Sequence, residues 1–198
     1  MRMINLKKPT KDLVRNYIDK FTNPPKEKFK HYPYQEKAVI KLKEEFPNNI
    51  ELVEILLKVG ILNSFYSTSI FKPFAVAQRI LDLNIDKRLK QGDPSLIKEI
   101  ASNTISGKKK NFYSFATKYC SMHNPEAYPI YDSYIEWLLL LYKKQYGFSD
   151  FKREDLKKYE KFIEIIKEFQ KFFNLNFSPK EIDQFLWMYA KEIKPNSY

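Results

Sequence analysis

Three side chains near the middle of the chain have types and a spacing that could form a chemical site. Ser114 and Lys118 lie four residues apart, so they share one face of the helix that we predict over residues 112–123. Asp132 follows two prolines and precedes a new amphipathic run, which places it at a helix start. The helix dipole keeps a carboxylate ionised at this position. Such a carboxylate could orient a water molecule or stabilise a developing positive charge.

The same residues also have structural explanations. Aspartate is a favoured N-cap, and Ser133 with Glu136 offers an alternative capping box for the same helix. Lys118 fits an exposed or salt-bridged helix lysine. It also fits a nucleophile whose long stem reaches back toward Asp132. Ser114 fits a small residue that permits close packing. We expect the bend at the two prolines to bring Asp132 close to the polar face of the preceding helix.

A glycine and three consecutive lysines separate two predicted helices. The segment 106–111 joins a helix that begins at Asp93-Pro94 to the helix of residues 112–123, as a short basic hairpin. Backbone N–H groups, a helix N-terminus and cations would converge there, which is typical of a phosphate site. A solvated charge run is the alternative. The candidate phosphate-contacting residues are Gly107, Lys108, Lys109, Lys110 and Asn111.

The whole chain is basic, with a net charge of +11 and an isoelectric point near 9.4. More than half of the excess lies in residues 1–50, which hold 12 Lys and Arg against 6 Asp and Glu. An excess of this kind is typical of proteins that contact phosphates. Solubility alone is the competing explanation, and charge does not separate the two.

Composition narrows the class of protein further. A chain of 198 residues with 43% hydrophobic residues has enough apolar surface for a packed core. Only 4 glycines argue against glycine-rich nucleotide loops and turn-dense β folds. One cysteine excludes an internal disulfide, and with 2 histidines it leaves no zinc cluster. We therefore expect no metal and no cofactor. Without a signal sequence or membrane span, we expect a soluble cytoplasmic protein.

Helical periodicity and capping residues predict an all-α chain of nine or ten helices, and no strand pattern competes. We expect the third helix, which is apolar on nearly all sides, to be the central helix of the core. The expected helices cover residues 10–22, 34–46, a segment from Asn48 or Asn49 to Gly60, 73–81, 93–105, 112–123, 133–145, 154–173 and a segment that begins at Ser178. Residues 84–91 are a short charged segment.

We expect one all-α domain over residues 1–198. Within it, residues 1–48 form basic N-terminal helices, residues 49–146 form the core that contains the hairpin, and residues 147–198 form C-terminal helices. Two small lobes that share a core are the alternative for a chain of this length.

The order of helix, glycine-containing hairpin, helix and then an aspartate at the next helix start resembles the helix-hairpin-helix DNA glycosylases. The similarity is greatest to their 8-oxoguanine DNA glycosylase-fold branch, which includes uncharacterised bacterial proteins. The segment SFATKYCSMHNPEAYPIYDSYI carries it, with LNSFYSTSI upstream, and it extends over residues 50–145. The resemblance implies a multi-helix fold with two lobes around a cleft.

The resemblance also implies roles for single residues. In that family a lysine after the hairpin attacks the sugar, and a later aspartate assists departure of the base. The matching positions here are Ser114 and Asp132. Serine cannot form a Schiff base, so the resemblance implies base excision without lyase activity. The two glycines of the family hairpin are reduced here to Gly107.

Base excision needs a pocket in which an extruded base can stack. The candidates for that pocket are Phe65, Tyr66, Tyr128, Tyr131 and His123. Aromatic residues at this density also form cores, and His123 fits equally a hydrogen-bonded structural histidine.

The leading hypothesis is therefore a protein that binds duplex or damaged DNA. It would be either a monofunctional DNA N-glycosylase or a descendant without catalysis, located in the cytoplasm at the bacterial nucleoid. The alternative is a non-enzymatic helical interaction protein, for example one associated with phage defence or a mobile element.

Overall fold

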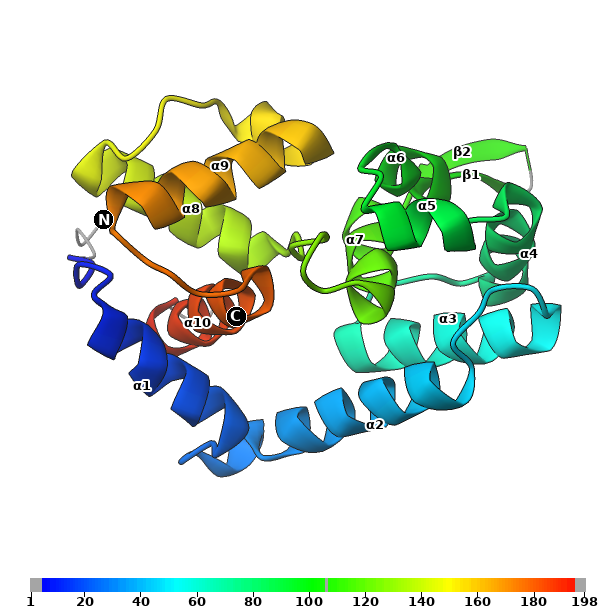
Figure 1. Cartoon of the computed structure of the whole chain (residues 1–198), viewed down its shortest axis with the longest axis horizontal. Helices are drawn as coiled ribbons and strands as arrows, with labels where there is room; N and C mark the ends of the chain where they lie inside the picture. Colours follow the sequence, from blue (N-terminus) through cyan, green and yellow to red (C-terminus); the bar gives the residue numbers. More distant parts are fainter. Residues whose placement is uncertain (1–4, 106, 195–198) are drawn as a thin grey trace. The chain divides into compact units, whose positions relative to one another are not determined.

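The computed structural model describes residues 5–105 and 107–194, which form helices and one β-hairpin (Figure 1). The all-α class is therefore confirmed, with the hairpin as an addition. The elements are α1 (Lys11–Thr22), η1 (Glu27–Phe29), α2 (His31–Glu45), α3 (Leu52–Tyr66), α4 (Pro73–Leu83), α5 (Asp86–Gln91), α6 (Ser95–Ala101), β1 (Ser102–Ile105), β2 (Lys108–Asn111), α7 (Tyr113–His123), α8 (Ser133–Tyr146), η2 (Arg153–Lys157), α9 (Tyr159–Phe172) and α10 (Pro179–Ile193).

The chain divides into two compact units. The first combines residues 1–32 with residues 131–198, and the second is residues 33–130. These boundaries differ from those expected at 48 and 146, because the N-terminal helix α1 packs along the C-terminal helix α10. Within the described residues, no helix combines the length and the apolar character needed to cross a lipid bilayer.

The first unit is held together by aromatic side chains. Helix α10 packs against both α1 and α8, and η2 contacts α8 and α9 (Figure 1). The ring of Tyr142 lies 5.3 Å from Phe169 and 6.4 Å from Tyr189, which connects three helices.

Capping residues set the helix starts: Thr10 accepts from Leu13 N at 3.2 Å, and the expected capping box at Ser178 is confirmed.

The second unit is a helical core around α3 and α7. Helix α3 packs on α4 and α7, and α6 packs on α4 and α7. The side chains that fill this core are fully or almost fully buried: Ile55, Val59, Leu62, Val76, Ile80, Leu96, Ile97, Ile100, Phe115 and Ala116. The β-hairpin extends from the end of α6 and contacts α4 and α6.

Three local expectations are wrong. The helix begun near Asp93 ends at Ala101, and residues 102–105 form a strand, because Thr and Ile favour extended backbone. Helix α3 continues through Gly60 to Tyr66, since one glycine inside a helix costs only about 1 kcal/mol. The long helix expected over 154–173 is divided into η2 and α9.

The third helix is also not buried on all sides. In α3 the side chain of Val53 is 72% exposed and that of Leu57 is 45% exposed, whereas Ile55, Val59 and Leu62 face the core. Periodicity cannot distinguish these faces when both carry apolar residues. The structure therefore shows an ordinary one-sided helix here.

Candidate functional site

The basic hairpin is a two-stranded antiparallel structure. Strands β1 and β2 pair from Ser102 with Asn111 to Ile105 with Lys108. The pairing ends at Ile105 on β1 and begins at Lys108 on β2. Ser106 lies outside the described residues, while Gly107 has φ of +72°, a backbone conformation that favours glycine.

All three lysines of the hairpin, Lys108 to Lys110, are exposed. Within the described part of the chain, none of them forms an ion pair with a carboxylate. Strand β2 leads directly into α7, where no side chain caps the helix start at Phe112. The backbone joins the two elements tightly, since Phe112 N donates to Ala101 O at 2.9 Å. The hairpin thus presents unpaired cations from a backbone held by β pairing.

Ser114 and Lys118 contact each other, as their spacing predicts. The Lys118 ammonium donates to Ser114 Oγ at 2.5 Å and lies 5.7 Å from the centre of the Tyr66 ring. Lys118 is only 4% exposed, so its interpretation as an exposed surface lysine is wrong. Helix α7 is buried from Phe115 to Ser121, because the rest of the second unit packs around it.

Asp132 is the N-cap of α8, which confirms the capping prediction. Its Oδ1 accepts from Tyr134 N at 2.9 Å. The alternative capping box does not form: Glu136 is buried, accepts from Tyr131 and pairs with Arg153 at 2.6 Å. Asp132 belongs to the first unit, whereas Ser114 lies in the second.

Two of the candidate base-pocket residues are core residues instead. Tyr128 is fully buried, and its hydroxyl donates to Asp93 O at 3.0 Å and Arg88 O at 3.3 Å. Tyr131 is also buried, with its ring against Phe162 at 5.8 Å. Neither ring has a face free for an extruded base, so these two assignments are wrong. Phe65 and Tyr66, at the end of α3, are half-buried.

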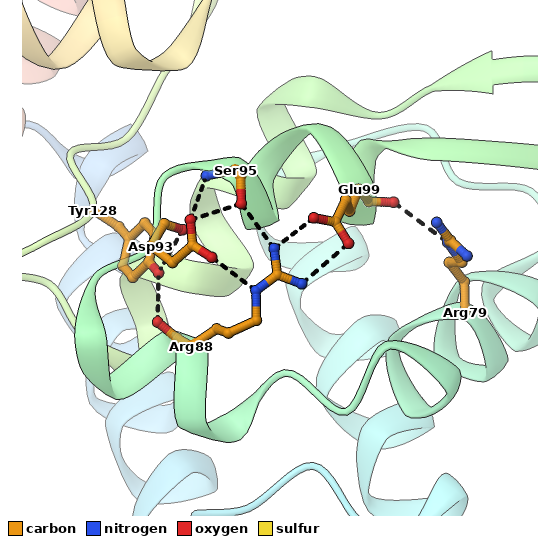
Figure 2. Close-up of polar contacts among 6 residues, drawn as sticks. All are labelled: Arg79, Arg88, Asp93, Ser95, Glu99 and Tyr128. Atoms are coloured by element: carbon orange, nitrogen blue, oxygen red, sulfur yellow. Dashed lines mark hydrogen bonds and ion pairs between the residues drawn. The ribbon is translucent and has the colours of Figure 1, made fainter.

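Figure 2 shows an arginine-centred cluster that the sequence did not indicate. Arg88 donates to Asp93 at 2.7 Å, to Ser95 at 2.8 Å, and to both oxygens of Glu99 at 2.5 and 3.1 Å. A hydrogen bond from Ser95 and then the guanidinium lower the pKa of Asp93, and the guanidinium lowers the pKa of Glu99. The cluster joins α5 to α6. The Tyr128 hydroxyl bonds to the backbone oxygens of Arg88 and Asp93, which attaches the bend after α7 to the cluster. The role of the cluster is therefore structural.

A second hidden cluster surrounds a lysine inside the apolar face of α3. The fully buried Lys58 donates to Phe46 O at 2.9 Å, Asn48 O at 2.5 Å and Asn49 Oδ1 at 3.0 Å. Asn49 in turn donates twice to Asp86, at 2.6 and 2.8 Å. Burial lowers the pKa of Lys58 to about 8, so the ammonium persists at neutral pH and supplies one proton to each acceptor.

His123 lies in the wall of a pocket of about 370 Å³ within the second unit. Burial, and then the charge of Lys58, lower the pKa of His123 to about 3. Its Nε2 has no hydrogen-bond partner among the described residues. The imidazole is therefore neutral at physiological pH and cannot act there as a proton donor in its charged form. The residues that line the pocket are Lys43, Pro47, Asn48, Asp86, Leu89, Lys90, His123 and Asn124.

These features define the chain as a helical protein with a lysine-bearing β-hairpin. Residues 13–127 match the HI_0787_N family, which is described as an N-terminal domain. An uncharacterised protein from Haemophilus influenzae is 54% identical over 144 residues, which cover 72% of this chain and 69% of that protein. The chain therefore belongs to the HI_0787_N family. No solved structure matches it.

Proposed function

We propose that this protein binds DNA through the hairpin lysines Lys108, Lys109 and Lys110. The observation that carries the proposal is the exposure of these three consecutive cations, unpaired within the described residues, on a paired β-hairpin. Such cations can contact phosphates without first breaking an ion pair. The net charge of +11 supports the same partner by long-range attraction. With DNA as the partner, we also propose a cytoplasmic, nucleoid-associated location.

We further propose a fold related to the helix-hairpin-helix DNA glycosylases, with excision of a base from DNA as the reaction. The order of α6, the hairpin, α7 and then Asp132 at the start of α8 supports this relationship. The chemistry that Asp132 would supply is stabilisation of positive charge on the sugar or orientation of water. Ser114 at the position of the family lysine supports hydrolysis without a covalent enzyme–sugar intermediate.

DNA binding is tested by fluorescence anisotropy on labelled duplexes at several salt concentrations. Replacement of Lys108, Lys109 and Lys110 by Ala should weaken binding and reduce the slope of log K against log salt by about 2.7, because each phosphate contact contributes about 0.9. The matched control replaces three exposed lysines of the first unit, Lys11, Lys144 and Lys167, and should change the slope less.

An equal effect of both triple variants would contradict the hairpin site. An affinity that does not change with salt would contradict phosphate contacts and favour the alternative of a non-enzymatic interaction protein. Equal folding of the variants is checked by circular dichroism.

Base excision is tested on oligonucleotides that carry oxidised or alkylated bases, with abasic sites revealed by alkaline cleavage. Asp132→Asn should abolish the product, while the helix start is retained because Asn caps as well as Asp. Borohydride should trap no covalent adduct. Product formation by Asp132→Asn would remove this carboxylate from the mechanism, and a trapped adduct would point to Lys118 as the nucleophile.

A further inference from the structure

Rings and ammonium groups alternate on one face of the first unit. The Lys191 ammonium lies 5.2 Å from the centre of the Trp187 ring and 4.1 Å from that of Tyr134. The Lys194 ammonium lies 4.5 Å from the same Tyr134 ring and 5.6 Å from the Trp137 ring. We call these five residues the ring–lysine cluster. Each of them is half-buried, so part of every side chain faces solvent.

Helix geometry explains the alternation. Residues 187, 191 and 194 are spaced by four and three positions, so they share one face of α10 through its C-terminal cap. Residues 134 and 137 are three positions apart on α8. Because α8 and α10 pack against each other, the two faces meet and the lysines lie between the rings. Tyr32 fixes the orientation of Trp187 by an edge contact with a centroid distance of 4.6 Å.

The charges of the cluster are not neutralised by nearby acids. Within the described residues, neither Lys191 nor Lys194 forms an ion pair, and the adjacent acid Glu192 is already bonded to Lys20 at 2.9 Å. Two ammonium groups beside one phenol ring repel each other, and the ring faces offset this repulsion only in part. An anion bound beside both would lower the energy of the arrangement.

We propose that the ring–lysine cluster binds single-stranded nucleic acid. The indole rings of Trp137 and Trp187 would stack on unpaired bases, and the two lysines would contact the phosphates between them. Aromatic rings with interleaved cations are the usual means of holding single strands, since every base offers a face for stacking. A duplex offers no such face, because its bases are stacked on one another. The inference rests on nucleic acid as the proposed partner, but it concerns a site separate from the hairpin.

The experiment uses the intrinsic fluorescence of the full chain. The protein has only 2 tryptophans, and both belong to the cluster, so their emission reports directly on this face. A 12-nucleotide oligo-dT strand should quench the emission, and a 12-base-pair duplex should quench it much less. Lys191→Ala with Lys194→Ala should weaken the single-strand affinity roughly 10-fold and reduce its salt slope by about 1.4, at about 0.7 for each phosphate contact.

Controls separate this inference from the proposed DNA site. Lys167→Ala with Lys171→Ala removes two exposed lysines of α9 and should leave the quenching unchanged. The triple hairpin variant should lose duplex affinity, measured by anisotropy, but keep the quenching by oligo-dT. If the duplex is not bound at all and oligo-dT still quenches, the proposed function fails and this inference stands.

Three results would overturn the inference: no quenching by oligo-dT, equal quenching by the duplex, or no effect of the double lysine variant. Lysine and tryptophan surfaces also bind anionic membranes. A blue shift with vesicles of phosphatidylglycerol, without quenching by oligo-dT, would therefore replace nucleic acid by a lipid surface. Trp137→Phe provides a second test, since it keeps an apolar ring and should reduce the quenching without unfolding the protein.

Discussion

The buried ammonium of Lys58 allows a quantitative prediction for Lys58→Met, a change that nearly keeps the volume of the side chain. Methionine removes the donor from Phe46 O, Asn48 O and Asn49 Oδ1. Loss of the donor costs about 2 kcal/mol at each of Phe46 O and Asn48 O, whereas Asn49 Oδ1 keeps a donor in the Tyr119 hydroxyl and loses about 1 kcal/mol, so the loss is about 5 kcal/mol. The substitution also relieves the burial of a charge. Lowering of the pKa from 10.5 to about 8 corresponds to about 3.5 kcal/mol, at about 1.4 kcal/mol per unit.

The loss of hydrogen bonds therefore exceeds the relief, and we expect Lys58→Met to destabilise the second unit by about 1.5 kcal/mol. For a chain of this size that is a fall in Tm of about 3 to 6 °C. Urea unfolding followed by far-ultraviolet circular dichroism measures the free energy. Amide hydrogen exchange shows whether the loss lies in α3 and α7, where it is expected, or also in the helices of the first unit.

The matched control is Lys41→Met, which changes an exposed lysine of α2 and should alter the free energy of unfolding by less than about 0.5 kcal/mol. The reasoning is refuted if Lys58→Met lies within that same range. It is also refuted if stability increases, because relief of the buried charge would then outweigh the three hydrogen bonds.

Three further predictions concern stability. The pKa of His123 is about 3 in the folded protein and 6.5 ordinarily, so between these values only the unfolded chain binds the proton. The free energy of unfolding, measured in urea, should therefore decrease as the pH is lowered from 6.5, by up to about 1.4 kcal/mol per pH unit, and decrease less in His123→Gln. Gly92→Ala should cost about 2 kcal/mol in thermal unfolding, because its φ is +70° and the new Cβ would lie 2.8 Å from Ala127 Cβ. Gly147→Ala is the control: its φ is +62° but no atom lies near the new Cβ, so it should cost about 1 kcal/mol. Equal losses in the two variants would contradict the steric argument. Asp132→Ala should cost about 1 kcal/mol and Asp132→Asn almost nothing in the same assay, and a large loss in both would mean that more than capping is removed.

Features that depend on neighbouring residues were predictable from the sequence. The cap at Thr10, the capping box at Ser178 and the cap at Asp132 each involve a backbone N–H only two or three positions away. The contact between Lys118 and Ser114 likewise follows from one helical turn. Interactions of this range form wherever the local pattern occurs, so periodicity and caps were sufficient for most helix starts and for the helical class.

Other features depended on the tertiary structure, because their partners are distant along the chain. The hydroxyl of Tyr119 reaches Asn49, 70 positions away, and Asn49 reaches Asp86, 37 positions away. No local pattern marks Lys58 as buried or Arg88 as the centre of a cluster, since lysine and arginine are usually exposed. The ring–lysine cluster belongs to the same group, since its members come from α8 and α10. Local hydrogen bonding determined where the helices begin, and packing between helices determined which polar side chains are enclosed and which remain open to a partner.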